Sequence, residues 1–282
     1  MSETTTAEPG PAAALSRLTY IGPTAGRPRY HLVDSSRDVI NRDRRTVLIE
    51  DARLRAQKPS LAREGFELFL HKSAVSDFSN QDALARIYPG EVERLVKQLS
   101  GADEVIVVSR GVLRFNTRDL PLSSHFEVMR PVPFVHVDVS ESTAAQFSVG
   151  WRSKENGRPV RRRAYYNVWR VVTPPPQDTP LAVCDARSVS LSDLVEIDAV
   201  TDIPGQPEST LALIMLRYSP EHRWSYYSNM ETDEVLVFKS HDSDPDEPCR
   251  VPHSAFRNPV CTPGALPRAS IDIRAMALWM EN

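Results

Sequence analysis

The segment Pro133-Phe-Val-His-Val-Asp-Val139 predicts a β-strand from which the rest of the chain can be interpreted. Successive side chains of a strand point to opposite faces, so residues two apart share a face. His136 and Asp138 therefore project together, whereas Val135, Val137 and Val139 face the other way. One face of this strand thus carries an imidazole and a carboxylate side by side.

A third donor of the same kind, His253, lies far downstream. Two imidazoles and one carboxylate can occupy one face of an octahedral iron ion and leave the opposite face open, which is the facial triad of non-heme Fe(II) oxygenases. A folded β-barrel can bring a distant strand beside the first one. His136, Asp138 and His253 are therefore predicted to form one metal site.

Arg268 and Ser270 follow about one strand and one turn after His253, in the segment Pro267-Arg-Ala-Ser-Ile-Asp-Ile273. Iron oxygenases that use 2-oxoglutarate need a cation deep in the barrel for the distal carboxylate of that cosubstrate. Arginine suits this task because its planar fork pairs bidentately with a carboxylate. Ser270 shares the strand face of Arg268 and can donate its hydroxyl to the same carboxylate.

Each of these residues also has an ordinary structural interpretation. A His-x-Asp pair in a β-rich protein is usually a hydrogen-bonded pair, and His253 and Arg268 taken singly are typical of surface residues. The ordered set favours the metal site over these alternatives. The remaining histidines do not share a face with a carboxylate on an expected strand; His125 is followed two residues later by Glu127 but lies outside the expected strands, and the others have no acid two residues away: His31, His71, His222 and His241.

The composition excludes several classes of partner. Of the 282 residues, 41% are hydrophobic and 25% are charged, and the formal net charge is −3, a balance typical of globular proteins. Nucleic-acid binding has no electrostatic support, and the basic run at 158–163 is interpreted as a solvated loop. No apolar stretch approaches the roughly 18 residues of a membrane span, so no membrane partner is expected.

Cysteine usage and the N-terminal sequence indicate the compartment. Cys184, Cys249 and Cys261 show no metal-finger spacing and leave one cysteine over in any disulfide scheme. A reducing, cytoplasmic setting is the simpler inference. The first residues lack the basic and then apolar order of a secretory signal.

Residues 1–15 are predicted to be a disordered tail, and residues 16–282 a single domain. Residues 17–33 suggest a hairpin, and 81–99 a helix broken near Pro89-Gly90. Many short strands without regular βαβ alternation predict a mainly β fold with flanking helices, a double-stranded β-helix (jelly-roll, cupin-like) core and an N-terminal α/β extension. The expected strands lie near 45–50, 67–71, 104–109, 134–139, 164–172, 181–189, 194–199, 210–218, 224–229, 234–240 and 268–279.

Several segments resemble the CmcJ-like family of Fe(II)/2-oxoglutarate oxygenases, which includes AsaB-type hydroxylase/desaturases and a gibberellin desaturase. The resemblance runs over most of the chain from about residue 60, and the Asn-x-Trp-Arg and Cys-Asp-Ala-Arg-Ser segments are its most specific parts. The matching segments begin at Gly65, Ser73, His136, Asn167, Leu181, Met230, His253 and Arg268.

The resemblance implies an enzyme that holds Fe(II) on His136, Asp138 and His253, receives 2-oxoglutarate on Arg268 with Ser270, and consumes dioxygen. It implies hydroxylation, desaturation or oxidative cyclisation at an aliphatic C–H bond of a small molecule in secondary metabolism. Asn167 would lie on a strand beside the site, where it could donate to the cosubstrate. The stretch 140–163 departs from the family, because it suggests an irregular basic insertion where a longer helix is expected; residues 148–163 are a candidate substrate lid.

A substrate with an anionic or polar anchor is expected, because arginines lie near the proposed mouth and tyrosines could line an apolar wall. Tyr165, Arg170, Tyr226 and Arg274 are candidate substrate contacts. For Arg170 the ordinary alternative, a salt bridge to Asp185 or Glu234, is preferred. The other residues considered for the anchor and the wall are Arg152, Arg158, Arg161, Arg162, Arg163, Tyr166 and Tyr227.

Two alternative functions stay open at the level of sequence. One is a non-catalytic jelly-roll protein that binds a small molecule. The other is an accessory protein of methyl transfer, although the chain has no glycine-rich nucleotide loop after a strand. A homodimer is one expected assembly.

Overall fold

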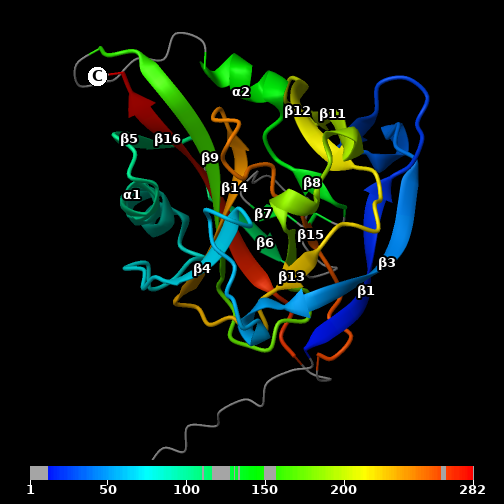
Figure 1. The fold of residues 1–282 in the computed structure, drawn as a ribbon, viewed down its shortest axis with the longest axis horizontal. Coiled ribbons are helices and arrows are strands. Elements are labelled where there is room, and N and C mark those ends of the chain that lie inside the picture. The colour runs from blue at the N-terminus through cyan, green and yellow to red at the C-terminus, as the bar shows by residue number, and fades with distance from the viewer. Residues whose placement is uncertain are drawn as a thin grey trace, which may run out of the picture.

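In the computed structural model of the protein, two β-sheets face each other as a jelly roll, and the longer helix lies outside them (Figure 1). The double-stranded β-helix expected from the sequence is therefore confirmed. The structure describes residues 12–109, 111–115, 128–129, 131–132, 134–148, 157–261 and 265–281.

The larger sheet contains both strands that carry the site histidines, His136 and His253. It curls so that its N-terminal strands lie at one side of the molecule (Figure 1). Within the described residues its strands follow the order β1 (Ala13–Ile21), β3 (Arg42–Asp51), β13 (Trp224–Tyr226), β10 (Leu181–Cys184), β15 (His253–Ala255), β8 (His136–Val137), β12 (Ser209–Leu216), β11 (Leu194–Thr201) and β2 (Arg29–His31).

The smaller sheet forms the opposite wall. Within the described residues its order is β4 (Phe66–Leu70), β14 (Glu234–Asp242), β9 (Val160–Val171), β16 (Ala269–Met280), β6 (Val112–Phe115) and β7 (Val128–Met129), and β5 (Glu104–Val107) also pairs with β16.

The alternation of side chains separates the two faces of the smaller sheet. On β16, Ile271 and Ile273 belong to an outer apolar cluster with Val168 of β9. Because residues two apart share a face, Ser270 and Asp272 point the other way, into the space between the sheets. In the first half of β16, the polar residues thus face the interior of the jelly roll and the two isoleucines face a helix.

That helix is α1 (Gln81–Ser100), which lies on the outer side of β9 and β16 (Figure 1). The side chain of Asn80 accepts from the backbone N–H of Ala83 at the start, and Gly101 adopts the left-handed conformation at the end. The expected break near Pro89 is wrong, since the helix continues through it. Tyr88 and Val92 on either side are fully buried against the sheet, so packing outweighs the cost of an internal proline.

The N-terminal expectations need two corrections. The tail was expected to reach residue 15, but β1 begins at Ala13, because Ala13 to Leu15 pair with Leu48 to Glu50 of β3. The hairpin expected at 17–33 is also wrong: β1 pairs with β3, and β2 pairs with β11 in parallel. Local turn signals at Gly22 and Gly26 did not decide these long-range pairings.

The stretch 140–163 is more regular than expected where the structure describes it. The short helix α2 (Glu141–Ser148) begins it, and β9 is already extended from Val160. Residues 149–156, the centre of the candidate lid, lie outside the described residues. The remaining short helices are η1 (Ser35–Arg37), η2 (Ala52–Leu54), η3 (Ala186–Ser188) and η4 (Leu191–Asp193).

Most of the expected strands are present, with differences at their ends. The strand expected at 181–189 stops at Cys184, because the Asp185 carboxylate caps η3 through the backbone N–H of Arg187. Three short strands, β6, β7 and β15, were not predicted, since two to four residues carry too little periodicity. No helix among the described residues is both long and apolar enough to cross a membrane.

Candidate active site

The two histidines far apart in the sequence face each other across neighbouring strands. His136 of β8 and His253 of β15 are direct partners in an antiparallel pair. Directly opposite residues of such a pair place their side chains close together on one face, and the ring centroids lie 4.2 Å apart. The strand pairing therefore creates the double-imidazole group that the sequence predicted.

Both rings turn the same nitrogen toward Asp138. The Nε2 atom of His136 lies 3.8 Å from one carboxylate oxygen of Asp138, and that of His253 lies 3.6 Å from the other. One donor atom from each of the three residues lies within 4.8 Å of the others. The three donors thus converge on one point, as a metal ion requires.

Backbone contacts set the tautomer of each ring. The Nδ1 atoms of His136 and His253 lie 2.9 and 3.4 Å from the carbonyl oxygens of Phe134 and Val251. A carbonyl can only accept, so Nδ1 carries the proton and Nε2 keeps its lone pair. Histidine ligands of metal ions are commonly oriented in this way.

The surroundings of these three groups keep each of them in the protonation state that a cation needs. Burial, followed by the neighbouring His253, lowers the pKa of His136 to about 3, and burial also lowers the pKa of His253. Burial alone would raise the pKa of Asp138, but Arg274, the two imidazoles and Asn167 together hold that pKa below its usual value. Two neutral imidazoles and an ionised carboxylate result, which is the donor set expected for Fe(II).

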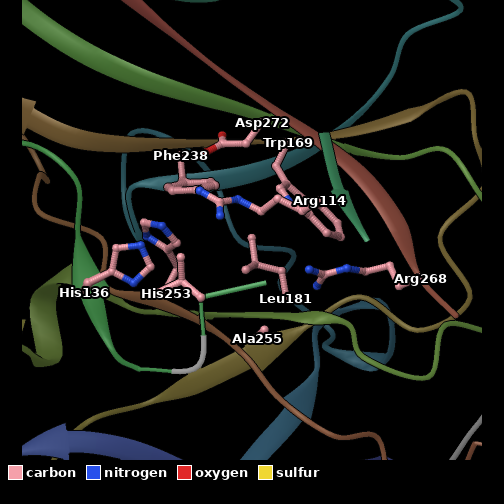
Figure 2. Close-up of a pocket in the computed structure, with 10 residues that line it drawn as sticks. Arg114, His136, Trp169, Leu181, Phe238, His253, Ala255, Arg268 and Asp272 are labelled. Carbon is pink, nitrogen blue, oxygen red and sulfur yellow. The ribbon is translucent and has the colours of Figure 1, made fainter. Parts of the chain in front are cut away.

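A cavity begins at the imidazoles and extends between the sheets. Figure 2 shows the two rings side by side at one end, with the side chains of Arg114 and Arg268 reaching toward them from the other side. Trp169, Leu181 and Phe238 supply apolar walls. The cavity thus combines apolar surface with a few polar groups, as small-molecule sites usually do.

Arg268 and Ser270 have hydrogen-bonding capacity that the described residues leave unused. Arg268 is 1% exposed; one terminal nitrogen donates to the carbonyl of Thr179, but Nε has no partner. The buried hydroxyl of Ser270 has none either. Burial, and then Arg114, lower the pKa of Arg268 to about 9. Buried donors without acceptors are costly, so the structure fits an anion such as a carboxylate here.

Asn167 has a different role from the one expected. Its amide nitrogen donates to Asp138 at 2.7 Å and lies 3.3 Å from Asp272, and its oxygen accepts from the Ser240 hydroxyl. Both ends of this amide are occupied by protein groups. The expected donation from Asn167 to the cosubstrate therefore has no free N–H to support it.

Two candidate substrate contacts lie away from the cavity. Arg170 points to the outer face of β9, where it bonds His71, Thr232 and Tyr88. The alternative of a salt bridge to Asp185 or Glu234 is also wrong, since those carboxylates bind Arg187, Arg223 and Arg53 instead.

Tyr226 is the second displaced candidate. It packs with Val137 and Trp224 in a cluster on the far face of the larger sheet. The strand β13 alternates, so Tyr227 rather than Tyr226 packs with Trp169 inside the jelly roll.

The other two candidates, Tyr165 and Arg274, lie on the inner face. Tyr165 packs against Val139 and Met276. A terminal nitrogen of Arg274 lies 3.8 Å from Asp138, and its side chain is 27% exposed. Arg274 thus connects the buried carboxylate with solvent.

The arginine cluster does not form one anchor. Arg162 turns outward to Asp242 and Glu247 and stacks on Trp279, while Arg158 donates to the backbone of Glu281. Tyr166 belongs to the outer cluster. Arg152 and His125 lie outside the described residues. The other described histidines each contact protein groups away from the cavity.

Among the charged residues that line the cavity, sequence reasoning missed Arg114 and Asp272. Arg114 of β6 is the register partner of Ser270, so it shares the inner face. Burial and then Asp138 raise the pKa of Asp272. The period of two that groups Arg268 with Ser270 could have found Asp272, whereas Arg114 depends on a pairing that no local pattern reveals.

Comparisons with known proteins agree with this geometry. The family profile described as "Oxidoreductase/YMDC permease-like domain" matches residues 18–278. The chain is 32% identical over 254 residues to the hydroxylase/desaturase CTB9 of Cercospora beticola, covering 84% of this chain and 78% of that protein. It is 28% identical to the Fe(II)/2-oxoglutarate-dependent dioxygenase nvfI of Aspergillus novofumigatus, over 76% of this chain and 78% of that one.

A solved structure shares the fold. The iron and alpha-ketoglutarate-dependent endoperoxidase NvfI superimposes with a TM-score of 0.81 at 24% identity, covering 96% of this chain and 100% of that chain. The converging donors, the cavity with its unsatisfied cation and these likenesses agree on one assignment. The chain belongs to the CmcJ/AsaB-like family and is an Fe(II)/2-oxoglutarate-dependent dioxygenase.

Proposed function

We propose that this protein oxidises an aliphatic C–H bond of a small molecule of secondary metabolism, with His136, Asp138 and His253 as the iron ligands. Arg268 and Ser270 are proposed to bind the distal carboxylate of 2-oxoglutarate. The observation that supports this most is the pair of donors that the described residues leave unsatisfied, Arg268 Nε and Ser270 Oγ, both buried, with Arg268 lining the same cavity as the two imidazoles. These donors provide a place for a carboxylate at a distance from the metal ligands.

Each protein group has a definable task. His136 and His253 present Nε2 lone pairs to the metal, because their Nδ1 protons are held by backbone carbonyls. Arg268 and Ser270 would hold and orient the distal carboxylate of the cosubstrate. When bound, Fe(II) and 2-oxoglutarate supply, with dioxygen, the oxidising power for an unactivated C–H bond. Trp169, Leu181 and Phe238 exclude water from that chemistry.

The substrate would approach from the side of Tyr165 and Arg274. These residues lie on the inner face near Asp138, and Arg274 is partly exposed, so it is the proposed anchor for an anionic or polar group. Small changes in substrate pose decide between hydroxylation, desaturation and ring closure. A cytoplasmic enzyme without a nucleic-acid partner, and a homodimer as its assembly, remain our proposals.

The decisive experiment measures succinate release from 2-oxoglutarate in air with Fe(II), across amino acids, peptides and terpenoid acids. We expect succinate that depends on both iron and a substrate. His136→Ala and His253→Ala should lose both turnover and retained iron. Full activity in either variant would reject the ligand set.

A non-catalytic binding protein predicts a different result. Such a protein would retain Fe(II) and 2-oxoglutarate and still release no succinate above the iron-free control with any compound. Oxidation of the compound in step with succinate release excludes this alternative.

A further inference from the structure

The side chain of Asn167, on the smaller sheet, hydrogen-bonds to Asp138, one of the three candidate metal ligands that the larger sheet positions. Asp138 follows β8 of the larger sheet, while Asn167 lies on β9, a central strand of the smaller sheet. The amide nitrogen of Asn167 is 2.7 Å from Asp138 Oδ2 and 3.3 Å from Asp272 Oδ1. One amide therefore lies between two carboxylates that would otherwise repel each other.

The orientation of this amide follows from its neighbours. Asp138 is ionised and can only accept, so the NH2 end must face it. The other end, Oδ1, accepts from the Ser240 hydroxyl of β14. A flipped amide would place its oxygen against carboxylate oxygens and lose both donations. Since Asn167 is fully buried, no bulk water can replace these partners.

Asp138 needs such a contact because its carboxylate is otherwise weakly held. The guanidinium of Arg274 lies 3.8 Å from a carboxylate oxygen of Asp138, and its side chain is partly exposed. That distance is beyond hydrogen-bonding distance. The carboxylate can rotate about its last bond unless a short bond fixes it. The contact with Asn167 is the short side-chain bond to Asp138 that the described part of the chain shows.

We infer that Asn167 is a positioning residue: its amide fixes the rotation of the Asp138 carboxylate and screens it from Asp272, so that Asp138 offers its metal-binding oxygen in a single orientation. The inference rests on the proposed role of Asp138 as an iron ligand. Ser240 acts behind Asn167, since its hydroxyl holds the amide in register. Partners that orient metal ligands in this way typically contribute 10–100-fold to metal affinity or activity.

The test uses the full-length protein, freed of metal and titrated with Mn(II) alone by calorimetry. Asn167→Leu keeps a side chain of similar size but removes both donations. We expect it to bind Mn(II) roughly 10–100-fold more weakly than the wild type. Ser240→Ala leaves the amide in place but loosens it, so a smaller loss in the same direction is expected.

A spectroscopic measurement separates positioning from general damage. Without oxygen, Fe(II) with 2-oxoglutarate gives a visible charge-transfer absorption band, whose position depends on the other ligands. Asn167→Leu and Ser240→Ala should shift or weaken this band. Val168→Ala is the matched control: it destabilises the same strand from its outer face and should leave both the band and the Mn(II) affinity unchanged.

The outcomes separate this inference from the proposed function. If His136→Ala abolishes Mn(II) binding while Asn167→Leu and Ser240→Ala keep wild-type affinity and band, the inference is overturned and the ligand set stands. If His136→Ala binds Mn(II) normally, the ligand set itself fails. If Asn167→Leu does not fold, the result for Ser240→Ala decides alone.

Discussion

Two buried arginines lie on neighbouring strands of the same sheet and differ in how their donors are used. Arg170 on β9 is 0% exposed and Arg268, just before β16, is 1% exposed. Arg170 donates to Tyr88, to the Thr232 carbonyl and to His71, on the side of α1. Arg268 faces the cavity, and its Nε has no partner among the residues that the structure describes.

This difference separates a structural arginine from a binding one. Both guanidinium groups lie near aromatic rings, Arg170 at 5.7 Å from Tyr88 and Arg268 at 5.4 Å from Trp169. Apolar surroundings and burial therefore do not distinguish them. What distinguishes them is the number of unused donors, because a buried donor without an acceptor costs free energy unless a ligand supplies one.

The largest effect is expected from Arg170→Met, which keeps the aliphatic length and removes the charge. The Thr232 carbonyl and both acceptors of His71, which are only partly buried, would lose their donor, at about 0.5–1.5 kcal/mol for each hydrogen bond lost. Thermal unfolding should show a melting temperature lower by several degrees. The 2-oxoglutarate affinity of the folded variant should not change; a selective loss of that affinity would contradict the structural role.

The opposite pattern is expected for Arg268→Ala. The dissociation constant of 2-oxoglutarate, measured by anaerobic titration of the Fe(II) enzyme, should rise about 10- to 150-fold, the equivalent of a charged hydrogen bond of about 1.5–3 kcal/mol. Arg268→Lys should also weaken binding, because it loses the bidentate fork. The melting temperature without ligands should fall less than that of Arg170→Met, because the Thr179 carbonyl alone, rather than three acceptors, loses this donor among the described residues. Unchanged affinity would move the role to Arg274, on the same inner face.

A smaller effect of the same kind is expected for Ser270→Ala. Its buried hydroxyl has no partner among the described residues, so removing it costs the unliganded protein little stability. Loss of one hydrogen bond to the cosubstrate, about 0.5–1.5 kcal/mol, should weaken 2-oxoglutarate binding about 2- to 10-fold. A clear drop in melting temperature without any change in binding would show that Ser270 serves packing alone.

The smallest effect is expected in the pH dependence of stability, through His71, which accepts from Arg170. Burial, followed by Arg170, lowers the pKa of His71 below its ordinary value near 6.5. Between the lowered pKa and about 6.5, the unfolded chain binds more protons at His71 than the folded chain. The contribution of neutral His71 to the free energy of unfolding is therefore complete above pH 6.5 and decreases as the pH falls below it.

Replacement of His71 measures that contribution. His71→Asn keeps an acceptor for Arg170 but cannot titrate. Its free energy of unfolding should therefore decrease less between pH 6.5 and 5 than that of the wild type, in urea titrations at several pH values. Equal pH dependence in the two proteins would remove His71 from this account, and Arg268→Ala serves as the control that keeps the wild-type slope.

The sequence by itself determined the groupings that depend on local periodicity. His136 with Asp138 and Arg268 with Ser270 share faces because side chains alternate along any strand, whatever surrounds it. The same alternation in many short segments predicted the jelly-roll class. Apolar residues spaced three to five apart predicted the helix at 81–99. These inferences need only the spacing of residues that are neighbours in the chain.

The tertiary structure alone decided which of these groups meet and what remains unsatisfied. His253 reaches His136 through the pairing of β15 with β8, Arg114 reaches Ser270 through β6, and Asn167 binds Asp138 across the two sheets. Packing gives the donors of Arg170 acceptors and leaves Arg268 Nε without one among the described residues. The physical reason is that strand order, sheet closure and burial depend on contacts between distant segments, and no local pattern encodes these.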